Sequence, residues 1–551
     1  MEETASGNQQ AFDEIYSLYD ISKAEQKNCR DDGDKINSLY FEPVLASVDR
    51  VLQDVGKDTE DYMTLLAMKA SLYYEQAKVL QIREQIPFAL ETMKNGLALV
   101  EEHRLHPLVT YQYYRLLNHH AYQLSRTDGI EEALKILEEA EQLYYGLTTK
   151  ADMLVYSTDD LFKRECEPRH VHNIGKFEKL VTNNLQIQGW IYNKQGLTDK
   201  FIVYHHRVLN RQLESQDGEG FAWVFKCARL ASHFISLHKF SEARYHLGAA
   251  VAVLRECERD LYRFQRNIDV DSIHRAYADL GKHWIKYGLW LFDSASKRVR
   301  DTDATLDRLL ITSFTDDCKQ TTAAAATQTG ITADEQLLTE TDVNTASGGD
   351  EQQALDTEVA ATHDGEEEQH YPETIDKYIF VFPSLTVADI EVQVPDTVST
   401  TEEARRLFLY SQEWLRRAKA YYTLRDHPAE YVSLVFELSD LYRYMAMHEP
   451  EVDSQYGVHR RRCDILDALY DMLREVQPIN YTATCIEVFR ELTQVQLDLL
   501  AYNLRRLQTC SETNSVTHVS QQYEALANVH QRLDKYIQVR PDQPAENVMI
   551  I

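Results

Sequence analysis

A spacing of small and large residues recurs in the first half of this chain, and it constrains the fold more than any other feature. Around Ala133, a small residue lies 12 positions before and another 7 positions after, at Ala121 and Ala140. Larger residues, Leu124 and Leu137, lie 9 positions before and 4 positions after. Two small residues that face each other allow two helices to approach closely, and large residues fill the space beside the crossing. The spacing therefore predicts a pair of antiparallel helices joined by a tight turn.

The same offsets occur at two further places. Ala243 has at these offsets Ala231, Phe234, Leu247 and Ala250, and Phe201 has Gly189, Tyr192, His205 and Val208. A repeated hairpin of about 34 residues with a small-residue crossing is the tetratricopeptide pattern. We expect an all-α, tetratricopeptide-like, right-handed α-solenoid of helical hairpins. An ordinary helical bundle with similar spacing is the alternative.

Few chain breakers interrupt the sequence. The 551 residues include 19 glycines and 12 prolines, which favours long helices with short connections. Apolar residues at three- and four-residue spacing predict the first-half helices, at 11–56 with a break at 31–34, then at 62–81, 87–102, 109–125, 130–145, 180–194, 197–214, 221–237, 241–255 and 273–299. A helical second half is predicted at 401–424, 428–448, 453–476, 480–508 and 515–538.

Between Lys319 and Lys377 the composition changes. These 57 residues contain 14 Asp or Glu and no Lys or Arg, so they bury too little apolar surface to offset ordering. We predict an N-terminal helical segment at 1–60, repeats at 61–300, a disordered acidic loop at 301–376, C-terminal helical repeats at 377–540 and a loose tail at 541–551. Residues 378–394 are apolar, and we expect them to lie as an extended segment across a helical surface.

The chain is acidic, with a formal net charge of −30. Nucleic acid and acidic membrane surfaces are therefore poor partners, and a basic protein surface is the natural complement. The other interpretation of the acidity is solubility. The eight cysteines are widely spaced without a CxxC pair, as expected for reduced thiols. No signal peptide and no membrane-spanning run are predicted, so we expect a cytoplasmic protein.

Enzyme signatures are absent, so we expect a non-enzymatic protein without cofactor. GxxxxGK[ST], GxGxxG, GxSxG and HExxH do not occur. The pairs at 119–120 and 205–206 are poor metal sites, because neighbouring helical residues point about 100° apart. Cys166, His170 and His172 form the nearest approach to a cluster, but they lack a second pair of ligands. The run at 460–462 predicts a solvated or salt-bridged face, or an internal clamp for acidic segments.

The register of the repeats predicts which residues line a concave surface. In such arrays the first helix of each hairpin faces the groove, and the polar or aromatic residues on those faces are Asn118, Tyr122, Ser125, Arg126, Gln186, Trp190, Asn193, Lys194, Ser232 and Ser236, with Arg229 nearby. A face of this kind suits capture of a helix or peptide around an aromatic anchor. The alternative is that they are ordinary exposed residues.

Six collinear stretches resemble one family. Residues 118–144 (NHHAYQLSRTDGIEEALKILEEAEQLY), 204–214 (YHHRVLNRQLE), 242–254 (EARYHLGAAVAVL), 281–291 (GKHWIKYGLWL), 402–422 (EEARRLFLYSQEWLRRAKAYY) and 459–466 (HRRRCDIL) are similar to the kinesin-binding tetratricopeptide family, the KIF-binding proteins. The chain is identified as a divergent, insect-like member. The resemblance covers roughly residues 60–540. It also implies a last helix after a Pro-containing linker, which this sequence does not show.

The resemblance implies a function. Members of this family clamp the motor domains of selected kinesins in the concave face and block microtubule attachment, with roles in cytoskeletal organisation, mitochondrial and vesicle transport and neuronal outgrowth. The chain would then be a monomer associated with the cytoskeleton, and an acidic groove would face the basic, microtubule-facing surface of the motor. The family's motor-contacting glutamine corresponds to Gln212, whereas Ile187, Trp190 and Arg229 depart from the family pattern. The alternative function is a co-chaperone adaptor that holds an acidic C-terminal peptide.

Overall fold

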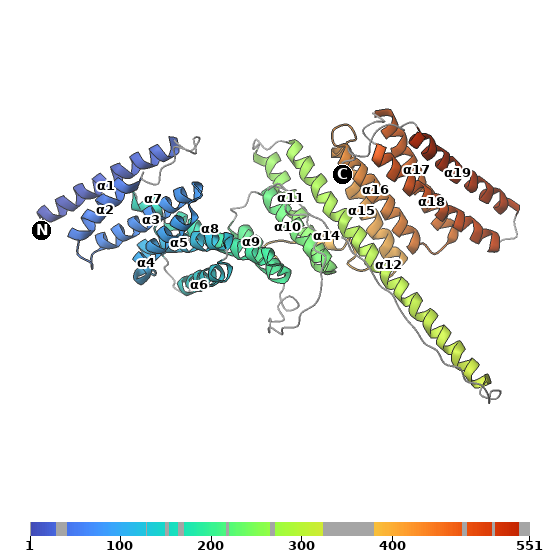
Figure 1. Ribbon diagram of the computed structural model, residues 1–551, viewed down its shortest axis with the longest axis horizontal. Coiled ribbons are helices and arrows are strands. Elements are labelled where there is room, and N and C mark those ends of the chain that lie inside the picture. Colours follow the sequence, from blue (N-terminus) through green and yellow to red (C-terminus); the bar gives the residue numbers. More distant parts are fainter. Residues whose placement is uncertain are drawn as a thin grey trace. The chain divides into compact units, whose positions relative to one another are not determined.

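The structure is a computed structural model that describes residues 2–28, 41–127, 129–148, 154–163, 170–215, 220–264, 270–322, 380–476, 482–509 and 513–538. Its described elements are all helical (Figure 1). The first half contains α1 (Glu2–Asn28), α2 (Glu42–Asp54), α3 (Glu60–Ile82), α4 (Ile86–Val100), the short 3-10 helix η3 (Glu101–His103), α5 (Pro107–Arg126), α6 (Ile130–Thr148), α7 (Thr158–Leu161), α8 (His170–Lys194), α9 (Thr198–Glu214), α10 (Gly220–Ser236) and α11 (Phe240–Phe264). These bounds agree with the predicted helices to within a few residues, apart from α1, which begins nine residues before the predicted start at 11, and the longer α8 and α11.

The three predicted hairpins are present as α5 with α6, α8 with α9, and α10 with α11. Ala121 and Ala133 are fully buried at the first crossing, as are Ala231 and Ala243 at the third. In the second hairpin, a Cβ added to Gly189 would lie 3.6 Å from the Cβ of Tyr204, an ordinary contact. The predicted all-α fold of stacked helical hairpins is therefore confirmed.

Tight turns close the second and third hairpins through one residue in the left-handed region. Gly196 has φ 73° between α8 and α9, and His238 has φ 56° between α10 and α11. After each, a backbone N–H returns to a carbonyl five residues earlier, from Leu197 to Tyr192 at 2.9 Å and from Lys239 to Phe234 at 2.9 Å. This pattern terminates the first helix and reverses the chain within three residues.

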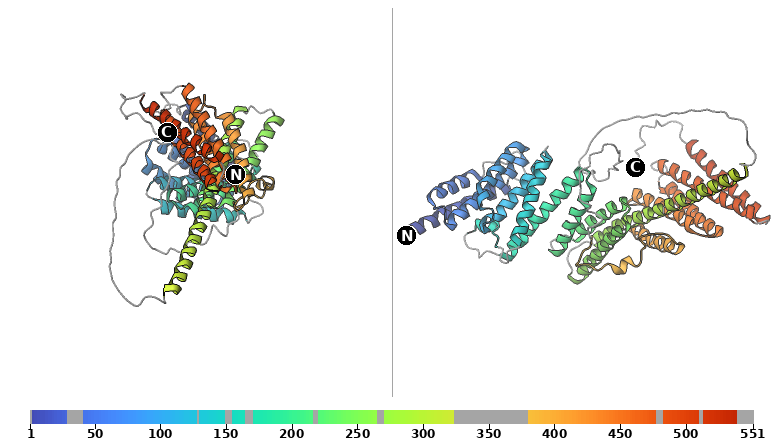
Figure 2. Two further views of the ribbon diagram at one scale, coloured as in Figure 1. Left: turned by 90° about the vertical axis from the view of Figure 1, so that its right-hand side faces the viewer. Right: turned by 90° about the horizontal axis from the view of Figure 1, so that it is seen from below.

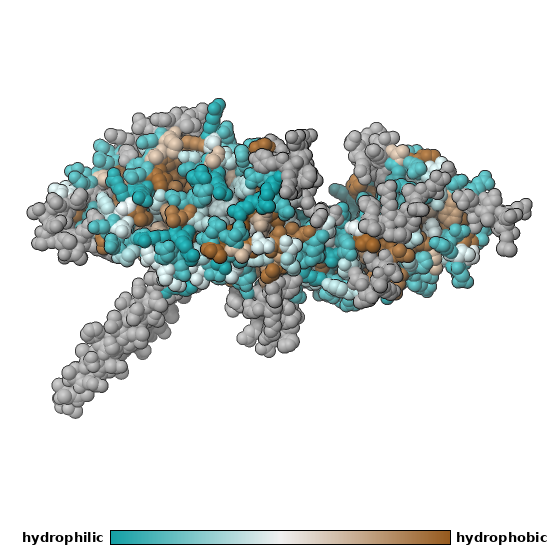
Figure 3. Space-filling model, turned by 180° about the vertical axis from the view of Figure 1, so that it is seen from behind, coloured by the Kyte–Doolittle hydropathy of each residue, from teal (hydrophilic) through white to brown (hydrophobic). Residues whose placement is uncertain are grey.

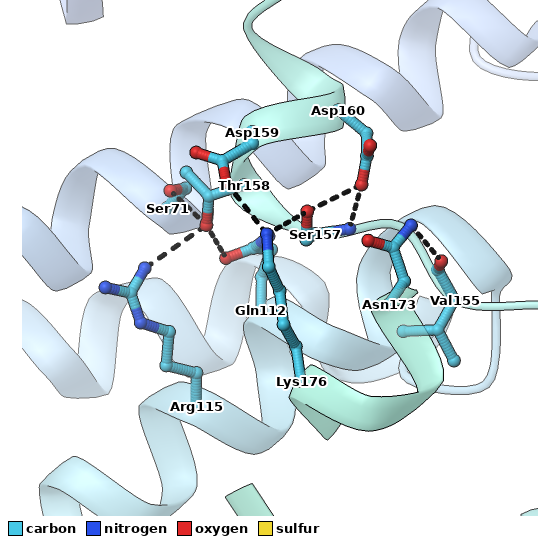
Figure 4. A network of polar contacts seen from close by, with 10 residues as sticks. All are labelled: Ser71, Gln112, Arg115, Val155, Ser157, Thr158, Asp159, Asp160, Asn173 and Lys176. Atoms are coloured by element: carbon cyan, nitrogen blue, oxygen red, sulfur yellow. Dashed lines mark hydrogen bonds and ion pairs between the residues drawn. The ribbon is translucent and has the colours of Figure 1, made fainter. Parts of the chain in front are cut away.

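A polar network fixes α8 against α3 and α5 (Figure 4). Thr158, at the start of α7, accepts a hydrogen bond from Arg115 at 3.2 Å and donates one to Gln112 at 3.1 Å. Lys176 on α8 donates to Asp159 at 2.8 Å. Arg115 also pairs with the buried carboxylate of Glu75 on α3 at 3.1 Å. These hydrogen bonds and ion pairs hold the connection between the first two hairpins and keep α5 and α8 in a fixed relation.

The segment at 380–398 lies across α9, α10 and α11, as predicted, but it is an irregular chain of turns with one short helix, α14 (Ala388–Glu391), and not the extended segment that the sequence analysis expected. Phe380 and Phe382 are buried, and Phe382 stacks on His206 with ring centroids 4.6 Å apart. The backbone is also held, because Tyr245 accepts a hydrogen bond from the Phe382 N–H at 2.8 Å. We call residues 380–398 the strap.

The chain divides into two compact units, residues 1–295 with 378–551, and residues 296–377. Helix α12 (Val270–Thr322) runs from the first unit into the second. Residues 301–322 are therefore helical, whereas the sequence analysis placed them in a disordered loop. Apolar residues in this stretch keep helical spacing, and the Lys- and Arg-free composition begins only after Lys319. The rest of the predicted acidic loop, 323–376, and the predicted tail, 541–551, lie outside the described residues.

The second half contains α15 (Thr401–Tyr421), α16 (Pro428–His448), α17 (Val452–Val476), α18 (Thr482–Thr509) and α19 (Thr513–Gln538). Consecutive helices pair from α15 to α19, and Figure 2 shows these pairs from two further sides. Thr400 is the N-cap of α15 and forms a capping box with Glu403, so the helix begins at Thr401, as predicted. A separate apolar core, with Leu466, Phe489 and Leu492 at its centre, holds α16, α17 and α18 together.

Helix α12 packs closely on α15 at a glycine. A Cβ added to Gly281 would lie 3.1 Å from the carbonyl oxygen of Trp414 and 3.6 Å from the Cβ of Ala418. Trp284 and Trp414 stack beside this contact, with ring centroids 6.3 Å apart. The two halves of the first unit therefore meet where backbone approaches backbone.

Gly281→Leu is expected to lower the free energy of unfolding by about 1–3 kcal/mol, because the added side chain must displace backbone atoms of α15. Gly457→Leu is the matched control, since that glycine is exposed on α17 with no atom within 4 Å of the added Cβ. Chemical denaturation of both variants measures the difference. Equal midpoints for the two variants would contradict the close packing of α12 on α15.

Candidate partner-binding surface

The first helices of two neighbouring hairpins, α5 and α8, present an exposed aromatic cluster. Tyr122 on α5 and Trp190 on α8 lie with ring centroids 6.3 Å apart. The Arg126 guanidinium lies 5.9 Å from the Tyr122 ring centroid, and the Lys194 ammonium lies 5.5 Å from that of Trp190. Trp190 is 42% exposed, which is high for a tryptophan. An aromatic pair with cations over its rings offers both apolar area and hydrogen-bond donors to a partner.

Buried amides beneath this cluster set the distance between the two helices. Asn118 on α5 donates to the Leu180 carbonyl on α8 at 2.7 Å, and Asn184 donates to the Asn118 side chain at 3.0 Å. Gln188 donates to Asn184 at 2.7 Å. Because each helix holds the other at defined positions, Tyr122 and Trp190 are positioned before any partner arrives.

Two residues predicted to line the groove are not available to a partner. Asn118 is 2% exposed, and Ser125 is fully buried, where its backbone carbonyl accepts a hydrogen bond from Lys194 at 3.3 Å. The expectation that both project into a groove is wrong. They lie on the side of α5 that faces α8, so their polar groups join two helices.

The remaining predicted residues lie in different places. Gln186 is half-buried one turn before Trp190 on α8, and Asn193 is exposed near the end of the same helix. Arg229 is exposed on α10, and Gln212 is half-buried near the end of α9. Among the described residues, no side-chain hydrogen bond or ring contact joins Arg229 or Gln212 to the Tyr122–Trp190 pair.

Three further predicted positions also differ. Ile187 is buried in the core between α5, α6 and α8, so it is not a contact residue. Ser232 on α10 lies against α12, with its Oγ 3.1 Å from Nδ1 of His283. Ser236 is exposed, but its hydroxyl donates to the His233 carbonyl at 2.7 Å. Only part of the predicted face is therefore open to a partner.

The charge of this surface differs from the charge of the whole chain. Helices α5 and α10 contain no Asp or Glu, whereas α6, the second helix of its hairpin, contains five Glu. The expectation of an acidic groove, drawn from the net charge, is therefore wrong for these first helices. The chain keeps its carboxylates on other helices, and the candidate surface offers aromatic rings, amides and cations.

The histidine pairs at 119–120 and 205–206, which the sequence analysis considered poor metal sites, belong to no metal-binding cluster within the described residues. Burial lowers the pKa of His205 and His206 to about 4 each. Nδ1 of His206 lies 3.1 Å from Nε2 of His246, whose Nδ1 donates to the Glu242 carbonyl at 2.7 Å. The pair of His206 and His246 packs against the strap. Sequence spacing alone did not reveal this contact. Cys166, His170 and His172 lie outside the residues whose side chains are described.

Apolar side chains on the surface are scattered. Figure 3 shows a largely hydrophilic face with small, separate hydrophobic patches. Within the described part of the chain, no helix has the length and apolar character needed to cross a lipid bilayer. The exposed Trp190 beside Tyr122 is accordingly a local feature of α5 and α8.

Stacked helical hairpins with a pre-positioned aromatic cluster define a helical-repeat protein of the kind that binds other proteins. Residues 221–348 and 332–539, more than half of the chain, match the family model for the C-terminal region of KIF-1 binding protein. The chain belongs to the KIF-1 binding protein family.

Two curated relatives and one solved structure give the extent of the similarity. The KIF-binding protein of Drosophila melanogaster is 23% identical over 452 residues, which are 80% of this chain and 65% of that protein. The KIF-binding protein of Gallus gallus is 22% identical over 511 residues, 90% of this chain and 77% of that protein. The chain thus spans about two thirds of the Drosophila relative. A solved structure of kinesin binding protein matches with a TM-score of 0.52 and 14% identity over 95% of this chain and 82% of that one, which shows the same fold.

Proposed function

We propose that this chain is a non-enzymatic protein that binds kinesin motor domains and blocks their attachment to microtubules. Its relatives carry the name KIF-binding protein, and this favours a motor partner over the co-chaperone alternative. The single observation that supports a binding surface on this chain is the exposed Trp190 held against Tyr122. We expect the protein to act as a monomer in the cytoplasm, at the cytoskeleton.

The physical character of the surface suits a motor helix laid across α5 and α8. Tryptophan, tyrosine and arginine are the residues that most often dominate protein interfaces, and all three lie in this cluster. Gln186 and Asn193 flank Trp190 on the same helix and supply amide groups for hydrogen bonds. Gln212 and Arg229, on α9 and α10, are proposed as further contacts. A motor whose microtubule-facing helix is covered in this way has no free surface for the microtubule.

A pull-down with purified kinesin motor domains, followed by microtubule co-sedimentation, tests the proposal. We expect at least one motor domain to bind and, once bound, to remain in the supernatant when microtubules are pelleted. The proposal fails if no motor domain binds. It also fails in its inhibitory part if bound motors pellet with microtubules as completely as free motors do.

Trp190→Ala is expected to weaken motor binding by about 1–2 kcal/mol, a loss of roughly five- to thirty-fold in affinity. The reason is that the indole provides the largest exposed apolar area of the cluster. Phe88→Ala is the matched control. Phe88 is a 67% exposed aromatic residue on α4, the second helix of its hairpin, whereas the proposed surface lies on first helices. Titration calorimetry measures both variants. An unchanged affinity for Trp190→Ala would move the binding surface elsewhere.

A further inference from the structure

A second surface, on α10 and α12, carries cations in a chain that is otherwise acidic. Helix α10 contains no Asp or Glu, and residues 280–292 of α12 contain none either. Lys226 and Arg229 lie one turn apart on α10, and Lys286 lies on α12. Arg229 and Lys286 are exposed, and Lys226 is half-buried. We call these three residues the cationic patch.

Contacts between the helices bring the three cations to one place. Ser232 of α10 contacts His283 of α12, at 3.1 Å between Oγ and Nδ1. The pKa of His283 is lowered to about 4, first by burial, then by Lys286 and, more weakly, by Arg229. Lys226 and Arg229 likewise lower the pKa of His205, after the larger effect of burial. Cations from both helices therefore act on one imidazole, that of His283.

The part of the chain that the structure describes does not neutralise these cations. The neighbouring Lys282 has local partners, since its ammonium lies 3.9 Å from a carboxylate oxygen of Asp279 and 3.9 Å from the Tyr422 ring centroid. Among the described residues, the side chains of Lys226, Arg229 and Lys286 form no ion pair or hydrogen bond. Lys282 therefore has a structural role, whereas the three charges of the cationic patch remain available to a partner.

The cationic patch stands out because the chain as a whole is acidic. With 88 acidic and 58 basic residues, carboxylates are the commonest charged groups, yet none lies on these two helix stretches. Like charges that are clustered repel one another, and the repulsion is relieved when a partner of opposite charge binds. Trp290, one turn beyond Lys286, is 38% exposed and offers an apolar anchor beside the charges.

We propose that the cationic patch binds a carboxylate-rich segment of the motor domain that is held at α5 and α8. The inference rests on the proposed function, because it assigns a second contact to the same partner. The acidic helices of this chain attract a basic protein from a distance. The cationic patch then fixes the position of the bound motor domain, because it binds the motor's carboxylates at one place. The motor surfaces that bind best are then those with acidic residues beside the docked helix.

Charge reversal tests the inference in the full chain. The variant Lys226→Glu, Arg229→Glu, Lys286→Glu is compared with Lys57→Glu, Lys94→Glu, Lys135→Glu, which changes the net charge equally at three exposed lysines elsewhere. Motor-domain affinity is measured by titration calorimetry at about 50 mM and 200 mM salt, since screening separates charge effects from packing. Circular dichroism and thermal melting verify that both variants are folded.

We expect the patch variant to lose tenfold or more in affinity at low salt and the control variant to change by less than threefold. Equal affinities for the two variants overturn the inference and leave the proposed function standing. If no motor domain binds the parent chain, the proposed function fails. A Glu-rich decapeptide, with its Gln-rich counterpart as control, then decides the patch by itself. Binding of the Glu peptide to the parent chain and not to the patch variant supports the patch, and no such difference overturns it.

Discussion

Arg462→Met should lower the free energy of unfolding of the α16–α17–α18 layer by about 3 kcal/mol. Arg462 is 1% exposed on α17, where its Nε donates to the Ser439 hydroxyl at 2.7 Å and one terminal nitrogen donates to Glu491 at 2.6 Å. Its other terminal nitrogen lies 3.5 Å from Asp498. Removing the guanidinium leaves two carboxylates of α18 without their common cation. Because both carboxylates are about a quarter exposed, water relieves part of the loss.

The neighbouring Arg461 provides the control. It is exposed on the same turn of α17, so Arg461→Met should change stability by less than about 0.5 kcal/mol. Chemical denaturation gives the stability, and hydrogen exchange locates the loss in α17 and α18. Adding Glu491→Gln to Arg462→Met should recover part of the stability, since it removes one of the unpaired charges. Equal losses for Arg461→Met and Arg462→Met would exclude the buried ion-pair network as the cause.

Spacing predicted the hairpins because their crossings depend on local chemistry. Ala121 and Ala133 are small where two helices touch, and such a requirement is written in the sequence at fixed offsets. The turns were equally visible, at Gly196 and at the polar pair that begins with His238. These features are short-range, so a single sequence carries them.

The candidate site was predictable only in part, because exposure depends on which helices become neighbours. Trp190 and Tyr122 were selected from the register and do lie together. Asn118 was selected by the same rule, yet its amide joins α5 to α8. The rule identifies the face of one helix, whereas the boundary between open surface and helix contact depends on the second helix.

Long-range partners account for the other differences. The run at 460–462 was compatible with a solvated face or an internal clamp, and the structure shows both, because Arg461 is exposed and Arg462 is buried against α18. The local sequence gives no indication that Glu491, 29 residues later, accepts a hydrogen bond from the Arg462 guanidinium. The prediction of an acidic groove was wrong for a similar reason. The net charge is a sum over 551 residues, and it does not show that α5 and α10 lack carboxylates.

Acid should destabilise the protein over the range from about pH 6.5 down to pH 4, because buried imidazoles resist protonation. The histidines concerned have pKa values lowered mainly by burial, to about 4 for four of them and about 3 for the fifth, and they are His119, His205, His206, His283 and His246. In the unfolded chain these groups bind protons near pH 6.5, whereas in the folded chain they do not. Unfolding therefore takes up protons in this range, and stability falls as the pH falls.

The magnitude follows from linkage. Each such histidine contributes roughly 3 kcal/mol between pH 6.5 and pH 4, with a slope of about 1.4 kcal/mol per pH unit once its unfolded form is protonated. Glu437 opposes them, since burial raises the pKa of its carboxyl to about 7 and its folded form takes up a proton first. That group stabilises the fold as the pH falls through the same range. The net uptake should therefore be smaller than five protons, by about one.

The strap makes one histidine pair the best test of this pH dependence. His206 and His246 contact each other and both pack on Phe382, so their protonation brings charge against a buried ring. His246→Gln should reduce the slope of stability against pH by about one proton between pH 6 and pH 5, whatever it does to stability at pH 7.5. His274→Gln, on the exposed side of α12, is the control and should leave the slope unchanged. Denaturation midpoints that do not vary between pH 7 and pH 5 would show that these imidazoles are not buried in solution.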